Sequence, residues 1–180
     1  MGLDMYLTKK IYVGAEYEHR KVTGKISIKV DGKPLPVNFS RVSYIEERLG
    51  YWRKANAIHR WFVNNVQNGE DDCGTYYVDI EKMEELLGIC KTLVTGLVLE
   101  DGKINNGYSI IGGERIDNLE DGKTIKNPEL ADELLPTGSG FFFGSTSYDE
   151  YYYQDILDTV SILEECLSDT SGEYYYHSSW

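Results

Sequence analysis

The start of the chain alternates apolar and polar residues in the way that is typical of a half-buried strand. Leu3, Met5 and Leu7 stand at every second position within residues 1–13, and a strand points successive side chains to opposite faces. The tail, residues 173–180, is also predicted to be a strand that closes the domain. We therefore expect a β-strand at each end of the sequence.

A β-hairpin is predicted after the first strand. Residues 25–30 alternate apolar and polar side chains, and an Asp-Gly dipeptide follows them directly. This dipeptide after such a run favours a tight turn, so residues 31–34 are expected to form the turn and residues 35–39 the return strand. Pro36 limits the return strand to an edge or an early position in a sheet, because proline has no backbone N–H.

Three segments have the period of amphipathic helices: residues 51–66, residues 80–98, and a segment that begins at Ser147 or Asp149 and ends at about Leu167. In the first segment, apolar side chains at about 100° per residue share one face. These are Tyr51, Ala55, Ile58, Phe62 and Val66. Asp79 is expected to cap the second helix, because its carboxylate can accept a hydrogen bond from a backbone amide that lacks a partner.

The remaining segments complete the expected fold. Short strands are predicted at residues 75–78 and 141–143. Residues 100–140 are rich in glycine, asparagine and acidic residues, so we expect a long irregular region there, with short ordered pieces near Ile110 and at 128–135. Helices mixed with mostly antiparallel strands predict a single α+β domain over the whole chain, with the sheet packed against about three amphipathic helices.

Composition adds two features to this picture. The 180 residues include 30 acidic and 18 basic residues, for a net charge of −12. Such a charge repels nucleic acid and attracts basic surfaces, so direct nucleic-acid binding is disfavoured. Eight of the 15 tyrosines cluster at residues 76–77, 151–153 and 174–176. Tyrosine is enriched at recognition surfaces, although each cluster can also be half core and half exposed strand or helix.

Several classes of protein are disfavoured by what the sequence lacks. No apolar run approaches the roughly 20 residues of a membrane-spanning helix, and the N-terminus lacks a signal-peptide pattern. Cys73, Cys90 and Cys166 are too widely spaced for a disulfide framework or a zinc site. The glycine-containing segments at 111–113 and 138–140 fit no phosphate loop. We therefore expect a cytoplasmic protein without metal or cofactor that is not an enzyme.

Long segments of the chain carry a family resemblance. They are MGLDMYL, GYWRKANAIHRWFVNNVQNGEDDCG, LLPTGSGFFFGSTSYDEYYY and the closing tail. These segments resemble a family of small, mostly uncharacterised proteins of bacteriophages, prophages and gut bacteria. The chain is also similar to anti-CRISPR proteins of comparable length that inhibit Cas9. This resemblance implies a location in the cytoplasm of a bacterial host, and it assigns no role to any residue.

The predicted helix at 51–66 is the first candidate site. Arg53 and Arg60 stand out in an acidic chain, and His59 and Trp61 lie beside them. Guanidinium groups match the geometry of phosphate, so this helix can bind a nucleotide or an acidic partner. The alternative is that these cations pair with neighbouring carboxylates on a solvated face.

His59 has a second interpretation, because Asp71, Asp72 and Cys73 follow it closely. A cysteine nucleophile activated by histidine is conceivable with these residues. The spacing matches no metal-ligand pattern, and no rule of spacing supplies a third orienting residue. A structural histidine is therefore the favoured interpretation.

The last predicted helix is the second candidate site. Glu150, Asp158 and Glu165 fall on its polar side, and Tyr151 adjoins them. A row of carboxylates at helical spacing can imitate a phosphate backbone in front of a basic groove. The alternative is an ordinary solvated face.

Two functional hypotheses follow. In the first, a protein encoded by a mobile element inhibits a host defence nuclease, Cas9 or the Cas9–guide RNA complex, by occupying its basic nucleic-acid-handling surface. In the second, a small-molecule module binds, sequesters or processes a nucleotide through the helix that carries Arg53 and Arg60. A deep cavity lined by that helix favours the second hypothesis, and a flat acidic face without a cavity favours the first.

Overall fold

The computed structural model describes residues 2–14, 17–21, 27–140, 142–169 and 171–180. Within these ranges the chain has the predicted α+β fold, with helices and mostly antiparallel strands. The elements in chain order are β1 (Asp4–Tyr12), η1 (Glu18–Arg20), β2 (Ile28–Val30), β3 (Lys33–Leu35), η2 (Phe39–Arg41), β4 (Tyr44–Arg53), α1 (Asn56–Asn65), β5 (Thr75–Val78), α2 (Ile80–Gly96), β6 (Leu99–Ile111), β7 (Glu114–Ile125), α3 (Pro128–Leu134), α4 (Glu150–Ser168) and β8 (Glu173–Ser179).

The central sheet has four antiparallel strands in the order β4-β1-β8-β5. Both predicted terminal strands are confirmed, and they are neighbours in the middle of the sheet, where Leu7 pairs with Tyr176. Met1, at the start of the first predicted strand, lies outside the described residues. The strand β5 was also predicted correctly, whereas β4 was not predicted as a strand.

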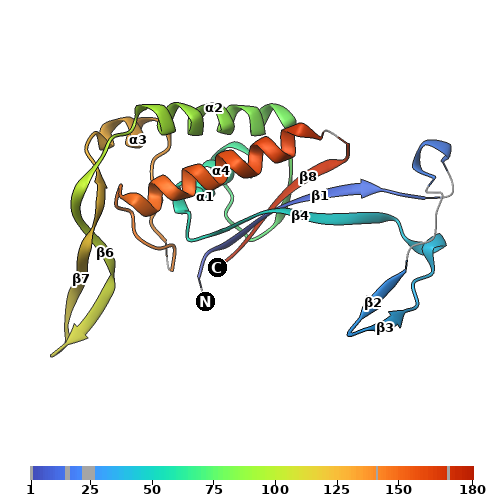
Figure 1. The fold of residues 1–180 in the computed structure, drawn as a ribbon, viewed down its shortest axis with the longest axis horizontal. Helices are drawn as coiled ribbons and strands as arrows, with labels where there is room; N and C mark the ends of the chain where they lie inside the picture. The colour runs from blue at the N-terminus through green and yellow to red at the C-terminus, as the bar shows by residue number, and fades with distance from the viewer. Residues whose placement is uncertain (1, 15–16, 22–26, 141, 170) are drawn as a thin grey trace.

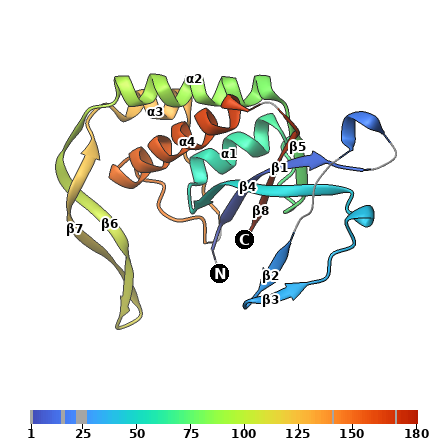
Figure 2. The ribbon, with the colours of Figure 1, turned by 45° about the vertical axis from the view of Figure 1, so that its right-hand side comes forward.

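The core lies between the sheet and the helices, which cover one of its faces (Figures 1 and 2). Leu3, Met5 and Leu7 are completely buried on that face, beside Tyr174 and Tyr176 of β8. The helices α1 and α4 pack next to the sheet, and α2 lies on α4 (Figure 1). Each fully buried side chain of this size contributes about 1.5–3 kcal/mol of hydrophobic free energy.

The first predicted helix begins later than its apolar pattern indicates. Residues 51–53 belong to β4, and α1 begins at Asn56. Lys54 has a left-handed backbone conformation with φ of 62°, which ends the strand and redirects the chain before the helix. Trp52 is buried in the core against Phe62, with ring centroids 6.1 Å apart. The apolar positions of residues 51–53 fit either a helix or a strand. These residues form a strand because they pair with β1.

The other two long helices, α2 and α4, are confirmed. Asp149 caps α4, because its carboxylate accepts hydrogen bonds from the backbone amides of Tyr151 at 3.0 Å and Tyr152 at 3.3 Å. Asp79 holds the N-cap position of α2, but its side chain accepts no capping hydrogen bond. Burial raises the pKa of the nearby Tyr77 phenol, and the charge of Asp79 adds to this effect. The predicted cap position is therefore confirmed, but the predicted hydrogen bond is not formed.

The region at 100–140, expected to be irregular, is mostly regular. The strands β6 and β7 form a long hairpin, here called the arm, which projects from the body in Figures 1 and 2. The glycines at 112 and 113 make its turn with φ of 62° and 89°, a conformation that favours glycine. Most of the arm is exposed, so its strands carry no apolar alternation that the sequence could reveal. The ordered piece predicted at 128–135 is α3.

The hairpin near the N-terminus is present, with a shorter turn than predicted. Asp31 and Gly32 have φ of 50° and 74°, and Lys33 already pairs with Val30. The return strand β3 ends at Leu35, before the proline. The first two residues of the predicted outgoing strand lie outside the described residues.

The strand predicted at 141–143 is not formed by the residues that the structure describes there. Phe142 has φ of 68°, and neither Phe142 nor Phe143 belongs to a strand. Phe143 packs into the core from a loop. Residue 141 lies outside the described part of the chain.

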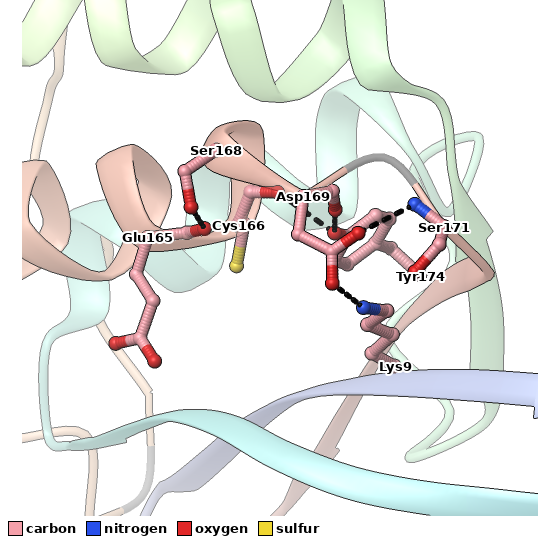
Figure 3. A network of polar contacts seen from close by, with 7 residues as sticks. All are labelled: Lys9, Glu165, Cys166, Ser168, Asp169, Ser171 and Tyr174. Carbon is pink, nitrogen blue, oxygen red and sulfur yellow. Dashed lines mark hydrogen bonds and ion pairs between the residues drawn. The ribbon is translucent and has the colours of Figure 1, made fainter.

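A polar network fixes the end of α4 to the sheet (Figure 3). The ammonium of Lys9, a residue only 3% exposed, forms an ion pair with Asp169 just beyond α4. The hydroxyl of Tyr174 donates to the carbonyl oxygens of Cys166, at 2.7 Å, and Asp169. Lys9 holds the pKa of the Asp169 carboxyl well below its usual range, because its charge and hydrogen bond stabilise the carboxylate.

Candidate functional site

A large cavity lies where β4, the loop at 137–149, the first turns of α4 and the middle of β6 meet. Its volume is about 850 Å³, which is within the range of small-molecule sites. The strand β6 has an irregularity between Asn105 and Tyr108, and these residues line the cavity. The arm therefore supplies one wall, and the body supplies the others.

The most buried polar group of the cavity is Asp149, which is 2% exposed. One carboxylate oxygen caps α4, as described above. The other, Oδ2, is buried and receives no hydrogen bond from the described residues, and neither does Oδ1 of Asn105. A buried acceptor without a donor costs about 1–3 kcal/mol. Two residues of the cavity lining therefore each have a buried oxygen that lacks a donor from the described residues.

A second carboxylate, Asp155, lines the same cavity one turn and a half further along α4. Burial raises the pKa of Asp155 to about 7, and the charges of Asp158 and Asp149 add to the effect. Burial also raises the pKa of Asp149, against the lowering effect of the two amides that it caps. Near neutral pH, Asp155 can therefore either donate or accept a hydrogen bond.

Two cations and a buried amide form the side of the cavity near α1. Arg53 and Lys54 are exposed residues of the lining. Asn56 is 4% exposed and holds the loop in place, because its Nδ2 donates to the carbonyl oxygens of Phe143 and Ser145, at 3.1 and 2.7 Å. The same side chain accepts a hydrogen bond from the amide of residue 138 at 3.0 Å. Asn56 therefore shapes the wall beside the two cations.

The first turn of α4 connects the cavity to the arm. The hydroxyl of Tyr151 lies 3.4 Å from a carboxylate oxygen of Glu120. Glu150 accepts a hydrogen bond from the backbone amide of Lys123 at 2.9 Å. Glu150 and Tyr151, predicted as partner-binding residues, thus contact the arm of the same molecule, and Tyr151 also lines the cavity.

The predicted row of carboxylates on α4 has fewer free members than expected. Asp158 and Glu165 are exposed on α4, about 10 Å apart along the helix axis at 1.5 Å per residue. Gln154 donates a hydrogen bond of 2.7 Å to Asp158. Because Glu150 is engaged with the arm, two exposed carboxylates rather than three remain in this row.

A second cavity, of about 360 Å³, lies beside His59 and Arg60. His59 is 2% exposed, with Nδ1 at 2.7 Å from the hydroxyl of Tyr176 and Nε2 at 3.0 Å from Oδ2 of Asp71. The indole of Trp180 donates to the other oxygen of Asp71 at 2.9 Å. Since both ring nitrogens pair with side chains other than Cys73, the geometry supports the structural interpretation of His59.

The structure separates the four candidate residues of the predicted basic helix. Arg53 lies in β4 and lines the larger cavity. Arg60 lies on α1 beside the smaller cavity, where its guanidinium donates to the carbonyl oxygen of Thr137 at 2.7 Å. Trp61 is 6% exposed and packs edge-on against Phe62. The prediction of one basic helical face is therefore wrong.

Several residues of the larger cavity were not predicted as site residues. Asn56 and Asn105 carry no sequence signal, because their roles depend on the loop and the arm that surround them. Asp149 was identified only as a possible helix start, and that position is what places its carboxylate at the cavity. Across the described ranges, no cluster of three or more histidine, cysteine, aspartate or glutamate side chains is placed to hold a metal ion.

Comparison of the chain with protein-family models, curated proteins and solved structures finds no match. Among the helices in the described part of the chain, none is long and apolar enough to cross a membrane. The cavity geometry is therefore the basis for assigning a function.

Proposed function

We propose that the protein binds a small phosphorylated ligand of the nucleotide class in the larger cavity. The observation that carries this proposal is the carboxylate of Asp149, which is almost fully buried and has one oxygen without a protein donor. Retaining such a group costs stability. A ligand that brings N–H or O–H groups would offset that cost when it binds.

The chemistry of the lining supports this class of ligand. The acceptors Asp149 and Asn105 suit the hydroxyls of a sugar or the N–H groups of a base. Arg53 and Lys54 are exposed lining residues, and a phosphate can reach them while it remains partly solvated. Tyr151 offers an aromatic ring near the same opening. Hydroxyl-rich and anionic parts of one molecule would therefore meet complementary groups.

A thermal-shift screen tests the proposal with nucleoside mono-, di- and cyclic phosphates, the matching nucleosides and sugar phosphates. A ligand at one hundred times its Kd stabilises the folded protein by about 2.7 kcal/mol. We expect a stabilising hit among the phosphorylated compounds and a weaker effect from the corresponding nucleoside. A flat response across all compounds contradicts the proposal.

Two variants and one control locate the ligand. Asp149→Asn keeps an oxygen for the helix cap but replaces the other oxygen with a donor, so it should abolish the shift. Arg53→Gln should weaken binding of the phosphorylated ligand more than that of the nucleoside. Arg48→Gln is the matched control, because Arg48 is an exposed arginine of the same strand and lines neither cavity.

We also propose, as a second candidate function, that the protein inhibits a nuclease, and the distribution of charge supports this proposal. The net charge of −12 and the exposed carboxylates of Asp158 and Glu165 suit a basic nucleic-acid-handling surface, and the resemblance to phage proteins and anti-CRISPR inhibitors points to Cas9. The test is cleavage by Cas9 with and without added protein, at increasing salt. We expect inhibition that weakens with salt and with Asp158→Asn/Glu165→Gln. Absence of binding to Cas9, with or without guide RNA, would refute it.

A further inference from the structure

The face of the central sheet that points away from the helices carries a row of aromatic side chains. In both Figures 1 and 2 the helices lie on the opposite side. Paired residues of neighbouring strands share a face, and the register puts seven rings on this one: Tyr6, Tyr12, Tyr44, Tyr51, Tyr77, Tyr175 and His177. We call these residues the tyrosine face.

The rings of the tyrosine face contact one another across the strands. Tyr6 lies 5.4 Å from Tyr51 and 6.0 Å from His177, and Tyr77 lies 5.9 Å from Tyr175, between ring centroids. Tyr51 is 46% exposed and Tyr77 is 51% exposed. Groups of contacting aromatic rings on one sheet face are typical of recognition sites rather than of scattered exposed residues.

Carboxylates accept hydrogen bonds from two of these phenols and lie near a third. Burial and the nearby charges of Asp79 and Glu173 raise the pKa of Tyr77. The hydroxyl of Tyr51 donates to Asp4 at 2.5 Å, and that of Tyr175 donates to Glu173 at 2.6 Å. These bonds raise the pKa of Tyr51 and of Tyr175, so both phenols stay neutral at physiological pH. Each of these rings therefore has a negative charge at its edge.

The tyrosine face already holds one cation of its own chain. The ammonium of Lys10 lies 4.6 Å from the ring centroid of Tyr175 and 5.1 Å from that of Tyr44. These distances are those of favourable cation–π contacts. The basic residues of this face lie on β1 and β4, whereas Glu173 is the first residue of β8 and Asp79 directly follows β5. The half of the face on β8 and β5 thus has aromatic rings and acidic groups, and, among the described rings there, only that of Tyr175 is covered by the ammonium of Lys10.

We infer that this half of the tyrosine face, centred on the exposed ring of Tyr77 and the carboxylates of Glu173 and Asp79, is a docking surface for an arginine-bearing segment of a partner protein. A guanidinium group stacks on aromatic rings and also forms paired hydrogen bonds with carboxylates, and Glu173 and Asp79 are placed to accept them. The net charge of −12 attracts such a segment. The same carboxylates repel phosphates, which disfavours nucleic acid as the occupant. The inference is independent of the ligand proposed for the cavity.

Fluorescence anisotropy with short labelled peptides tests the inference on the whole protein. The probes are an arginine–glycine peptide, lysine–glycine and glutamate–glycine peptides of equal length, and single-stranded oligo(dT). We expect the arginine peptide to bind most tightly, with an affinity that falls as salt rises. Tyr77→Ser and Glu173→Gln should each weaken it about tenfold, which corresponds to 1.4 kcal/mol.

Control variants separate this surface from the cavity and from misfolding. Tyr108→Ser removes a tyrosine of similar exposure, 54%, from the arm and should leave peptide affinity unchanged, as should Arg53→Gln. Tyr77→Phe keeps the ring and should retain most of the affinity. An unchanged m-value and a folded baseline of Tyr77→Ser in urea unfolding show that its loss of affinity is not an unfolding effect. The inference is overturned by no binding of the arginine peptide, by equal affinity for the lysine peptide, by preference for oligo(dT), or by equal losses in Tyr77→Ser and Tyr108→Ser.

Discussion

The hydroxyl of Tyr176 lies 2.7 Å from Nδ1 of His59, and this contact joins the last strand to the first long helix inside the core. A carboxylate only accepts hydrogen bonds, so Nε2 of His59 donates to Asp71 and Nδ1 is left to pair with the phenol. The ring of Tyr176 also stacks on Phe62, with centroids 4.0 Å apart. Tyr176 is therefore held in place by a hydrogen bond to His59 and by stacking on Phe62.

Tyr176→Phe should destabilise the fold although it preserves the stacked ring. The substitution leaves Nδ1 of His59 buried without its partner, which costs about 1–3 kcal/mol. Urea unfolding should show a lower midpoint with an unchanged m-value. Tyr77→Phe, which removes an exposed hydroxyl, is the control and should change the free energy of unfolding by less than about 0.5 kcal/mol. Equal effects of both substitutions would mean that the contact with His59 contributes no net stability.

The sequence predicts elements whose buried face repeats with a clear period. Leu3, Met5 and Leu7 identify β1, and the apolar residues of α2 and α4 identify two helices, because each of these elements packs one face into the core. The strand β4 escapes prediction because most of its residues are exposed and only Gly50 and Trp52 are buried. The two strands of the arm were not predicted for the same reason, since an exposed two-stranded hairpin needs no alternation of apolar and polar residues.

The candidate site could be predicted only in part, because it is built from residues far apart in the sequence. The cations of the site were recognised by charge, and Arg53 does line the larger cavity. The buried acceptors could not be found in this way, since burial of Asn105 and Asp149 results from the arm folding next to α4. The sequence shows which side chains are charged or polar. It does not show which of them are removed from water, because that depends on how distant segments pack together.

Asp155→Asn should change how stability depends on pH. The folded-state pKa of Asp155 is raised to about 7, whereas an aspartate in an unfolded chain has a pKa of about 3.9. Between these values the folded protein binds the additional proton, so this group's contribution to the free energy of unfolding falls as pH rises. The variant cannot ionise and should be more stable than the wild type at pH 8, by about 1–3 kcal/mol, and similar to it at pH 4.

Urea unfolding of both proteins at several pH values measures this effect. Asp158→Asn is the control, because it removes one of the charges that raise the pKa of Asp155 but leaves the buried carboxyl in place. This control should give a smaller gain at pH 8. A constant difference between Asp155→Asn and the wild type across the whole range would contradict the raised pKa.

The ion pair between Lys9 and Asp169 should make stability sensitive to acid. The folded-state pKa of Asp169 lies below its unfolded value, so its contribution is complete above about pH 4 and is lost as pH falls below that value. Asp169→Asn should lower stability at pH 7, because it leaves the buried ammonium of Lys9 without its carboxylate. Lys9→Met should cost less, since it leaves only a carboxylate that is 57% exposed.

Free energies of unfolding between pH 2 and pH 7 distinguish these variants. In both variants, stability should fall less with acid than in the wild type, because the contribution of Asp169 is lost. At pH 7, Asp169→Asn should be less stable than Lys9→Met. If Lys9→Met were the less stable variant, the apolar stem of Lys9 would matter more than the pairing of its charge.

Asp149 can be tested for stability and ligand binding separately, because its two oxygens have different surroundings. Asp149→Ala removes the cap from the amides of Tyr151 and Tyr152 and should lower the free energy of unfolding by about 0.5–2 kcal/mol. Asp149→Asn retains one oxygen for the cap and removes a buried charge, so it should be at least as stable as the wild type when no ligand is present. Thermal or urea unfolding measures both. If Asp149→Asn were as destabilised as Asp149→Ala, the second oxygen would be required by the fold itself, and the main support for a ligand in the larger cavity would be lost.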